Sequence, residues 1–399
     1  MMRLTRTATA VALALSLALP VAVASSASAA DAPSAAPAAE APRQQALQLP
    51  RPTGQYGVGS SVFHLVDRSR KDPWVPTAEG RELMVTMHYP AARRGGGGAP
   101  ARYATTAEAK ALIEGFGVRG VPPEVLSATR THSRVGARPA VGKFPLVVLS
   151  PGFSASRFTL TNAAEDLASR GYVVALVDHA YESFGMSMPG GRTLSCVACK
   201  ALDVDGVPAS VVTSTRAKDV SFLLDRLTGR KAERQHPELS RLIDHRRIGM
   251  AGHSIGGASA ASTMAGDRRV LAGVNMDGAF WEDLPPQGLD GRPFMMLGTD
   301  DDVHRPGGKD TTWDRMWPTL DGWKRWLTVA GSDHGSFSDF PLILAHFGLP
   351  QPPLPAARAA DLVRTYLAAF FDQHLKGVEQ PVLAGPSAQH PEVVFHHQR

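Results

Sequence analysis

The chain has 399 residues, of which 43% are hydrophobic and 20% are charged. This composition supplies enough apolar side chains for a large core and excludes a wholly disordered protein. The 42 basic and 37 acidic residues leave a formal net charge of only +5, and the sequence has no run of five Lys or Arg, so we expect no nucleic-acid partner. Two cysteines are too few for a disulfide framework or an all-cysteine zinc site.

The first thirty residues have the pattern of an export signal. Arg3 and Arg6 precede an apolar run over residues 8–24, and Ala27 and Ala29 have the spacing that signal peptidase accepts. Because the run is short for a membrane span and contains a proline, we expect a signal peptide over residues 1–30 and secretion into the extracellular medium. Residues 31–53, rich in Ala and Pro, predict a linker, and one folded domain is expected over residues 54–399.

Beyond the linker, apolar strands alternate with helices. In chain order we expect strands over 62–66, 83–89, 144–149, 172–177, 248–251, 270–276, 293–297 and, as the last one, 325–329, with helices over 106–114, 159–169, 218–227, 255–265, 313–320 and 360–374. The strands from residue 144 onward are apolar on both faces, as in a parallel sheet. The pattern predicts an α/β fold, with a mainly parallel central sheet, helices on both faces and a ligand site at the carboxyl ends of the strands.

A Gly-x-Ser-x-Gly pattern marks one of these strand ends. It runs from Gly252 to Gly256, between a buried strand and a helix, with Ser254 at its centre. This arrangement is the nucleophile elbow of an α/β-hydrolase, where the glycines leave room for the strained turn that lifts the serine hydroxyl clear of the sheet. We expect Ser254 to be the nucleophile; the alternative is a glycine-rich turn without function.

A serine nucleophile needs a base and an acid to orient that base. His334 follows the strand expected to be last and is the predicted base. Two strand ends offer an acid: Asp277, and the run Asp300–Asp302 with Asp301 as its candidate. In most α/β-hydrolases the acid follows the later strand, which favours Asp301, although three consecutive aspartates are also common in solvated turns.

The transition state of ester hydrolysis needs two backbone amides that bind its oxyanion. One is expected from Ile255, directly after the serine, and the other from Phe153, in the loop after the strand 144–149.

Four segments together resemble the secreted platelet-activating factor acetylhydrolase family. They are Phe144 to Phe153, the elbow, Asn275-Met276-Asp277-Gly278, and Gly331-Ser332-Asp333-His334. The resemblance implies a serine ester hydrolase of short or oxidised acyl chains, without metal or cofactor, and it favours Asp277 as the acid. We therefore predict Asp277 as the acid, with Asp301 as the runner-up. Pro151 departs from the family, which often has His there. The chain is also similar to bacterial cutinase-like lipases and polyester hydrolases, whose acid follows the later strand.

Four candidate functions follow. The first is a secreted ester hydrolase that acts on ester or lipid substrates such as phospholipid sn-2 acetyl-type esters, with transient contact to a lipid surface and no obligate protein partner. The alternatives are a cutinase-like lipase or polyester hydrolase, a peptidase or amidase on the same fold, and a non-catalytic binding protein on a hydrolase scaffold. Intact Ser254 and His334 argue against the last.

A few features stand apart from this chemistry. Cys196 and Cys199 form a C-x-x-C that predicts a disulfide in a secreted chain. Residues 183–211 are long for a connection, so they are either a lid with Met186 and Met188 facing substrate or a solvated insertion.

Two groups of aromatic residues have an open role. A tryptophan cluster indicates either core packing or a patch that meets lipid. A second group is expected to shorten the acyl pocket. The first group comprises Trp313, Trp317, Trp323 and Trp326, and the second Phe153, Phe280 and Trp281.

Overall fold

The computed structural model describes residues 45–92, 97–229 and 237–397. The predicted signal peptide and most of the predicted linker lie outside these residues. Leu47 and Leu49 are already buried, and Gln48 pairs with Arg130, so the packed chain begins upstream of the expected boundary at residue 54. No helix in the described part is both long and apolar enough to cross a lipid bilayer.

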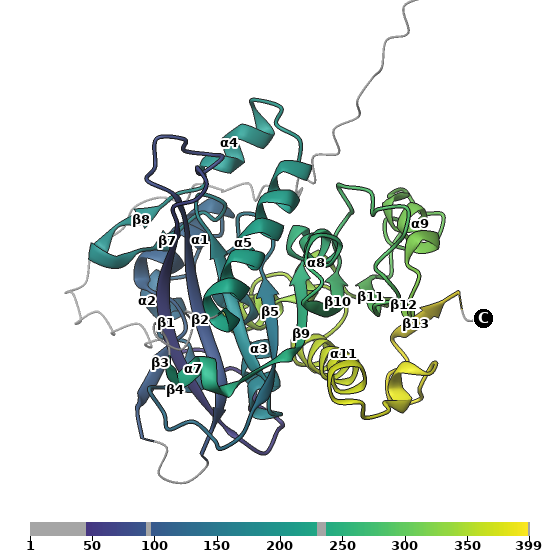
Figure 1. The fold of residues 1–399 in the computed structure, drawn as a ribbon. Coiled ribbons are helices and arrows are strands. Elements are labelled where there is room, and N and C mark those ends of the chain that lie inside the picture. The colour runs from purple at the N-terminus through teal and green to yellow at the C-terminus, as the bar shows by residue number, and fades with distance from the viewer. Residues whose placement is uncertain (1–44, 93–96, 230–236, 398–399) are drawn as a thin grey trace, which may run out of the picture. The chain divides into compact units, whose positions relative to one another are not determined.

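The described chain forms an eleven-stranded sheet and a small hairpin (Figure 1). The strands are β1 (Gly57–Asp67), β2 (Arg81–Ala91), β3 (Ala99–Arg102), β4 (Arg130–Val135), β5 (Phe144–Ser150), β6 (Val173–His179), β9 (Ile243–His253), β10 (Val270–Met276), β11 (Phe294–Thr299), β12 (Lys324–Val329) and β13 (Val393–His396), with β7 (Met186–Ser187) and β8 (Thr193–Leu194) in the hairpin. The sheet order is β13-β12-β11-β10-β9-β5-β6-β2-β1-β4-β3.

The centre of this sheet is parallel and its margins are mixed. Six consecutive strands run parallel to one another, namely β6, β5, β9, β10, β11 and β12. At the two ends of this parallel set, β2 pairs with β6 and β13 pairs with β12 in antiparallel orientation. The predicted α/β class and parallel core are therefore confirmed. The prediction that residues 325–329 form the last strand is wrong, because β13 follows in the chain and forms the sheet edge beyond β12.

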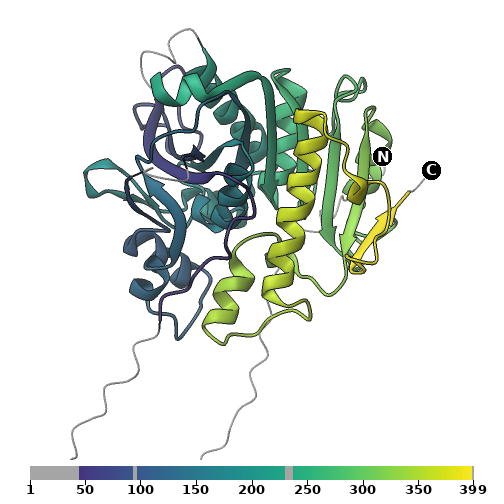
Figure 2. The ribbon, with the colours of Figure 1, turned by 90° about the horizontal axis from the view of Figure 1, so that it is seen from below.

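Helices cover both faces of the sheet. They are α1 (Thr106–Gly115), α2 (Pro123–Ser127), α3 (Thr161–Ser169), α4 (Val197–Asp203), α5 (Ser210–Thr228), α7 (Pro237–Leu242), α8 (Ile255–Gly266), α9 (Thr312–Met316), α10 (Phe340–His346) and α11 (Ala356–Lys376), with 3₁₀ turns η1 (Arg157–Leu160), η2 (Pro189–Gly191), η3 (Trp317–Thr319), η4 (His334–Phe337) and η5 (Pro381–Leu383). Figure 2 shows α11 in yellow on the near side of the green strands.

Alternating side chains of each central strand enter two different cores. Val147 and Leu149 of β5 pack in the core formed with α3 and α11, while Leu146 and Val148 pack in the core formed with α5 and α8. Burial on both faces explains why the strand reads as an unbroken apolar run. The two cores fix the sheet rigidly and leave its carboxyl edge to position polar side chains.

Candidate active site

The elbow serine lies between β9 and α8 in a strained backbone conformation. Ser254 has φ 56° and ψ −129°, a region that non-glycine residues adopt only where the surrounding structure imposes it. A Cβ atom on Gly252 would lie 2.3 Å from the backbone of Gly256, and one on Gly256 would lie 2.2 Å from the carbonyl oxygen of Ser150. Both glycines are therefore required by the packing of the turn.

A chain of hydrogen bonds joins Ser254, His334 and Asp277. His334 is the first residue of η4, directly beyond β12. Its Nδ1 lies 2.6 Å from Asp277 Oδ2, and its Nε2 lies 3.0 Å from Ser254 Oγ. With the Nδ1 proton donated to the carboxylate, Nε2 is left to accept the proton of the serine hydroxyl. Burial lowers the pKa of His334, but the hydrogen bond and charge of Asp277 outweigh it and raise that pKa above its usual value.

Asp277 is held as a buried carboxylate at the end of β10. Its backbone has φ 59°, and the Asn275 side chain supports this turn by bonding both the amide and the carbonyl of Gly278. The amide of Thr299 donates to Asp277 Oδ1 at 2.6 Å. Although burial opposes ionisation, His334, His304 and this amide lower the pKa of Asp277 to about 2. The side chain stays negative through the working range of an esterase.

The runner-up acid is used for a different purpose. Asp301 Oδ1 accepts hydrogen bonds from the amides of Val303 and His304, at 2.9 and 3.0 Å, and Asp300 pairs with Arg305. Among the described contacts of His334, the carboxylate at Nδ1 belongs to Asp277. The position on the later strand therefore does not bring Asp301 to the imidazole.

The two amides expected to bind an oxyanion are available beside the serine. Within the described residues, neither the Phe153 nor the Ile255 amide donates to a protein acceptor, and their side chains belong to one apolar cluster. A Cβ atom on Gly152 would lie 3.4 Å from Ser254 Cβ and 3.0 Å from His253 Nδ1. Glycine at this position lets the oxyanion loop approach the serine closely.

Two histidines that the sequence did not assign to the site touch its members. The ring of His253 lies 4.7 Å from that of His334, and its Nε2 donates to the His334 carbonyl at 2.7 Å. Burial and the neighbouring His334 lower the pKa of His253 to about 3, which keeps this donor neutral. His304 Nδ1 lies 3.3 Å from Asp277 Oδ1. Its only signal in the sequence is its place three residues after Asp301.

The segment over residues 183–211 packs against the oxyanion residues. The predicted disulfide between Cys196 and Cys199 is confirmed, and Cys196 and Val197 join the apolar cluster of Phe153 and Ile255. The expectation that Met186 and Met188 face substrate is wrong, because both are buried with Met84 and Leu194. Beside the site this segment forms a hairpin and α4, of which α4 packs on the apolar cluster of Phe153 and Ile255, while residues 189–193 and 203–206 are exposed to solvent.

The aromatic groups divide between core and surface. Trp313 and Trp326 are fully buried, which confirms the core-packing interpretation for these two residues. Trp317 and Trp323 are partly buried and pack against the same two cores. Phe280 is also buried in the core, so it cannot line an acyl pocket as expected, while Trp281 is 51% exposed.

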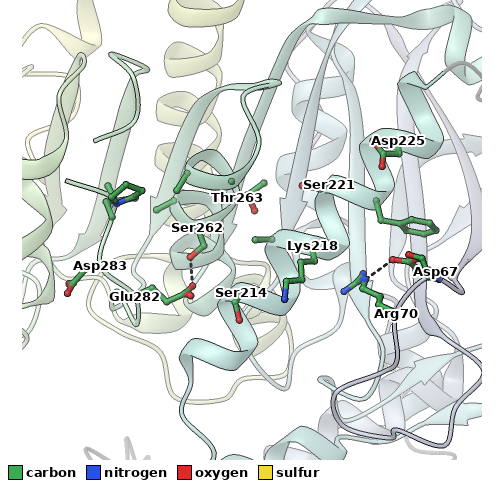
Figure 3. Close-up of a pocket in the computed structure, with 18 residues that line it drawn as sticks. Asp67, Arg70, Ser214, Lys218, Ser221, Asp225, Ser262, Thr263, Glu282 and Asp283 are labelled. Atoms are coloured by element: carbon green, nitrogen blue, oxygen red, sulfur yellow. Dashed lines mark hydrogen bonds and ion pairs between the residues drawn. The ribbon is translucent and has the colours of Figure 1, made fainter. Parts of the chain in front are cut away.

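A cavity of about 550 Å³ lies between α5 and α8 (Figure 3). Its lining includes Arg70, Ser214, Lys218, Ser262 and Glu282 and none of the three hydrogen-bonded residues. The groove is mixed in charge, and Glu282 is already bonded to Thr213 and Ser262. Within the described chain, His, Cys, Asp and Glu side chains do not gather in threes as metal ligands.

Comparisons with known proteins agree with this geometry. Residues 126–189 and 233–351 match the family described as platelet-activating factor acetylhydrolase, isoform II. A probable 1-alkyl-2-acetylglycerophosphocholine esterase of Arthroderma benhamiae is 28% identical, over 87% of this chain and 93% of its own. The platelet-activating factor acetylhydrolase of dog is 24% identical, over 58% of this chain and 57% of its own.

A solved structure extends the agreement to the fold. The ferulic acid esterase from Streptomyces cinnamoneus is 43% identical, with a TM-score of 0.78, over 88% of this chain and 99% of that one. The chain belongs to the platelet-activating factor acetylhydrolase family. It has the α/β-hydrolase fold and is a carboxylic ester hydrolase.

Proposed function

We propose that this esterase is secreted and hydrolyses short-chain acyl esters through an acyl-enzyme on Ser254, with His334 as base and Asp277 as the orienting acid. The observation that carries the proposal is the continuous hydrogen-bonded chain from Asp277 through His334 to Ser254 Oγ, at a strained strand-to-helix turn. The export pattern of residues 1–30 and the disulfide support secretion, because disulfides persist in oxidising compartments.

The proposed reaction has two halves. His334 Nε2 takes the hydroxyl proton as Ser254 Oγ attacks the ester carbonyl, and the amides of Phe153 and Ile255 bind the resulting oxyanion. When the intermediate collapses, the bond to the alcohol breaks and the alcohol leaves with the proton from His334. Water then gives a proton to His334, attacks the acyl-enzyme and releases the carboxylic acid, after which the proton returns to Ser254. Asp277 stays ionised and stabilises the imidazolium throughout.

Two substrate classes have support. The family and the fungal and mammalian relatives point to acetyl-type esters, including those at the sn-2 position of phospholipids. The bacterial ferulic acid esterase, which is the relative of higher identity, favours aromatic acyl esters as a second candidate. A cutinase-like lipase remains the alternative with longer acyl chains.

Covalent labelling tests the proposal directly. A fluorophosphonate should add once to the chain, on the peptide that contains Ser254, and the Ser254→Ala variant should lose both the adduct and the hydrolysis of p-nitrophenyl acetate. Ser214→Ala, a serine on the neighbouring α5, is the matched control and should keep both. A folded chain that takes up no label would instead be the non-catalytic binding protein.

A further inference from the structure

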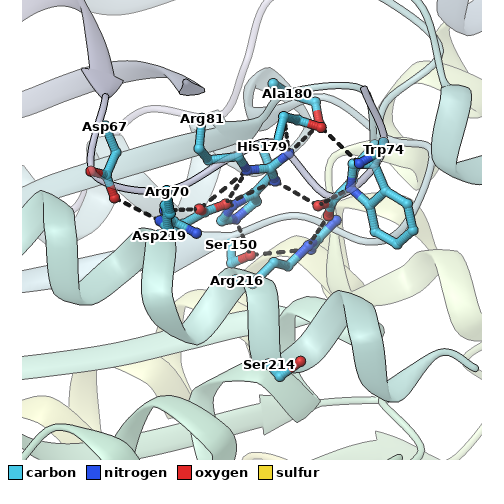
Figure 4. A network of polar contacts seen from close by, with 12 residues as sticks. Asp67, Arg70, Trp74, Arg81, Ser150, His179, Ala180, Ser214, Arg216 and Asp219 are labelled. Carbon is cyan, nitrogen blue, oxygen red and sulfur yellow. Dashed lines mark hydrogen bonds and ion pairs between the residues drawn. The ribbon is translucent and has the colours of Figure 1, made fainter. Parts of the chain in front are cut away.

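A network of buried charges contacts the start of the proposed oxyanion loop, Ser150 to Ser154, through Ser150 and Pro151 (Figure 4). It joins β2, β6, α5 and the loop after β1, and none of its members belongs to the Ser254–His334–Asp277 chain. We propose that Arg216, paired with Glu182, is a positioning residue that sets the place of the Phe153 amide. The inference rests on the proposed function, because it gives that amide the role of oxyanion donor.

Arg216 holds the residues on the amino side of Phe153. Its side chain is 1% exposed, and its Nη1 donates to the Pro151 carbonyl at 2.5 Å and to Ser150 Oγ at 3.2 Å. A bond to a main-chain oxygen fixes the peptide itself, whatever the side chain there. The guanidinium therefore controls the path of the backbone two residues before the donor.

Glu182 holds the residue on the carboxyl side. Its carbonyl oxygen accepts the Ser154 amide at 2.9 Å, and its carboxylate accepts Arg216 Nε at 2.7 Å. Ser154 has φ 64°, so the loop turns sharply just after Phe153. The Arg216–Glu182 pair thus holds the loop on both sides of the Phe153 amide, while that amide keeps no protein acceptor among the described residues.

The pair is itself fixed from the other side. Glu182 Oε1 accepts Arg81 Nη2 at 2.6 Å and Trp74 Nε1 at 3.0 Å. Burial would raise the pKa of Glu182, but Arg81 and Arg216 hold it below its usual value, so the carboxylate stays charged. Neither partner of the pair can rotate away without losing a buried bond.

Two more residues, His179 and Asp219, complete the support of Ser150. His179 Nδ1 lies 2.7 Å from Asp219 Oδ2, and its Nε2 lies 3.1 Å from Ser150 Oγ. Burial and the charge of Arg216 lower the pKa of His179, so the neutral ring donates to Asp219 and accepts from Ser150. This repeats the connectivity of the proposed triad, but Ser150 is fully buried and cannot reach a substrate. The oxygen of Ser150 also accepts a hydrogen bond from Arg216 Nη1.

Stability alone does not explain why the charged side chains of this network are buried. Ion pairs buried at such depth are often matched or exceeded in stability by apolar side chains of similar size. A guanidinium, unlike an ammonium, can bond a carboxylate along one edge and a carbonyl along another with fixed angles. The network therefore fixes the position of the oxyanion loop. Such a position matters, because a displacement of about 1 Å in a catalytic donor can cost on the order of 10²-fold in rate.

Two variants and one control test the proposal. Arg216→Lys keeps the charge beside Glu182 but cannot reach all three acceptors. The double variant Arg216→Met with Glu182→Met removes both charges at similar volume, so it leaves no carboxylate without its arginine if the lysine variant fails to fold. Lys218→Met is the matched control, because Lys218 is an exposed cation two residues along the same helix.

The measurements are the melting temperature, kcat and KM for p-nitrophenyl acetate, the inhibition constant of a trifluoromethyl ketone, and the final stoichiometry of fluorophosphonate labelling. The ketone forms a tetrahedral oxyanion on the serine, so its affinity reports the oxyanion site separately from the fold. In the folded variants we expect kcat and ketone affinity to fall together, by roughly 10²-fold, while KM stays within about threefold. Lys218→Met should match the wild type.

The proposal is overturned if either folded variant keeps wild-type kcat, or if kcat falls while the ketone binds as tightly as before. Failure of the proposed function would look different, since wild-type protein would then take up no label at Ser254. Full labelling of wild type and variants, combined with unchanged kinetics, rejects only the role of Arg216.

Discussion

Asp277 and Asp301 follow neighbouring strands, and local hydrogen bonds decide which of them reaches the histidine. Asp301 Oδ1 already accepts two amides of its own loop, whereas Asp277 is turned by its positive φ so that one oxygen faces Thr299 and the other faces His334. A local cap of this kind is what Asp commonly provides in turns.

Replacing Asp277 or Asp301 by asparagine should show which of the two acts as the acid. Asp277→Asn should lower kcat for p-nitrophenyl acetate by about 10⁴-fold, because an amide can stabilise the wrong imidazole tautomer and cannot balance the imidazolium charge. Asp301→Asn should stay within about threefold, since its Oδ1 can still accept both amides. The two variants are measured side by side with melting temperatures as the control for folding. Near-normal activity of Asp277→Asn with loss in Asp301→Asn would reverse the assignment.

The pH profile should report His334. Only the neutral imidazole can take the serine proton, so activity is lost as pH falls through the pKa of His334, which the hydrogen bond and charge of Asp277 raise above its usual value. Because the pKa of Asp277 is about 2, that carboxylate should not contribute to the acid limb of kcat/KM near neutral pH. In Asp277→Asn the residual limb should move to lower pH. An acid limb that stays at the same pH in Asp277→Asn as in the wild type would contradict the contact between Asp277 and His334.

At this scale the sequence could identify only residues that carry a local pattern. Ser254 lies in a motif, and His334 and Asp277 follow predicted strands, so their meeting could be expected from topology. Arg216 has no such signal, because its partners Glu182 and Pro151 come from other segments and its burial depends on them.

At the scale of elements, the sequence predicted well those strands and helices whose buried side chains are apolar. The central strands are apolar on both faces, and β5, β6, β10, β11 and β12 match their predicted bounds within two residues. β9 is longer than the predicted strand over 248–251, because its first part is polar and partly exposed. The helix expected over 218–227 begins earlier, at Ser210. The apolar spacing did not indicate its first half, because the buried face there carries polar residues such as Thr213 and Arg216. β4 and β13 were missed for a related reason, since both are short and partly exposed.

The disulfide of α4 offers a prediction at this scale. Replacing Cys196 and Cys199 together by Ser should lower the free energy of unfolding by about 2 kcal/mol or less, because stabilisation grows with the length of the closed loop and only three positions separate these cysteines. Since α4 packs against Phe153 and Ile255, KM for p-nitrophenyl butyrate should rise while kcat changes little. Urea unfolding and steady-state kinetics check both effects. A fall in kcat as large as that expected for Arg216→Lys would instead give α4 a part in catalysis.

For the whole molecule, the sheet brings four distant segments to one edge. The proposed oxyanion loop follows β5, the proposed nucleophile Ser254 follows β9, the proposed acid Asp277 follows β10 and the proposed base His334 follows β12. These strands are neighbours or near neighbours in the sheet order, so the two cores that hold them also hold the site. The site is nevertheless open to solvent, since the His334 side chain is 42% exposed.

This openness bears on substrate length. With Phe280 buried in the core, Phe153 and the exposed Trp281 are the remaining aromatic candidates for a wall beside the acyl chain. A wall discriminates by excluding or failing to bury methylenes, each worth roughly 1–3 kcal/mol. We therefore expect a graded preference, with kcat/KM for p-nitrophenyl acetate and butyrate above that for octanoate, and palmitate poor but measurable.

Two variants locate that wall. Phe153→Ala keeps the backbone amide and should raise the ratio of octanoate to butyrate kcat/KM by on the order of tenfold, whereas Trp281→Ala, on the exposed loop after β10, should leave the ratio unchanged. Methyl ferulate is assayed in parallel, because efficient hydrolysis of it would assign the enzyme an aromatic acyl group. A wild-type maximum at octanoate or beyond, under micelle-free conditions, would place the enzyme with the cutinase-like lipases, since an open triad with no limiting wall accepts a long chain as readily as a short one.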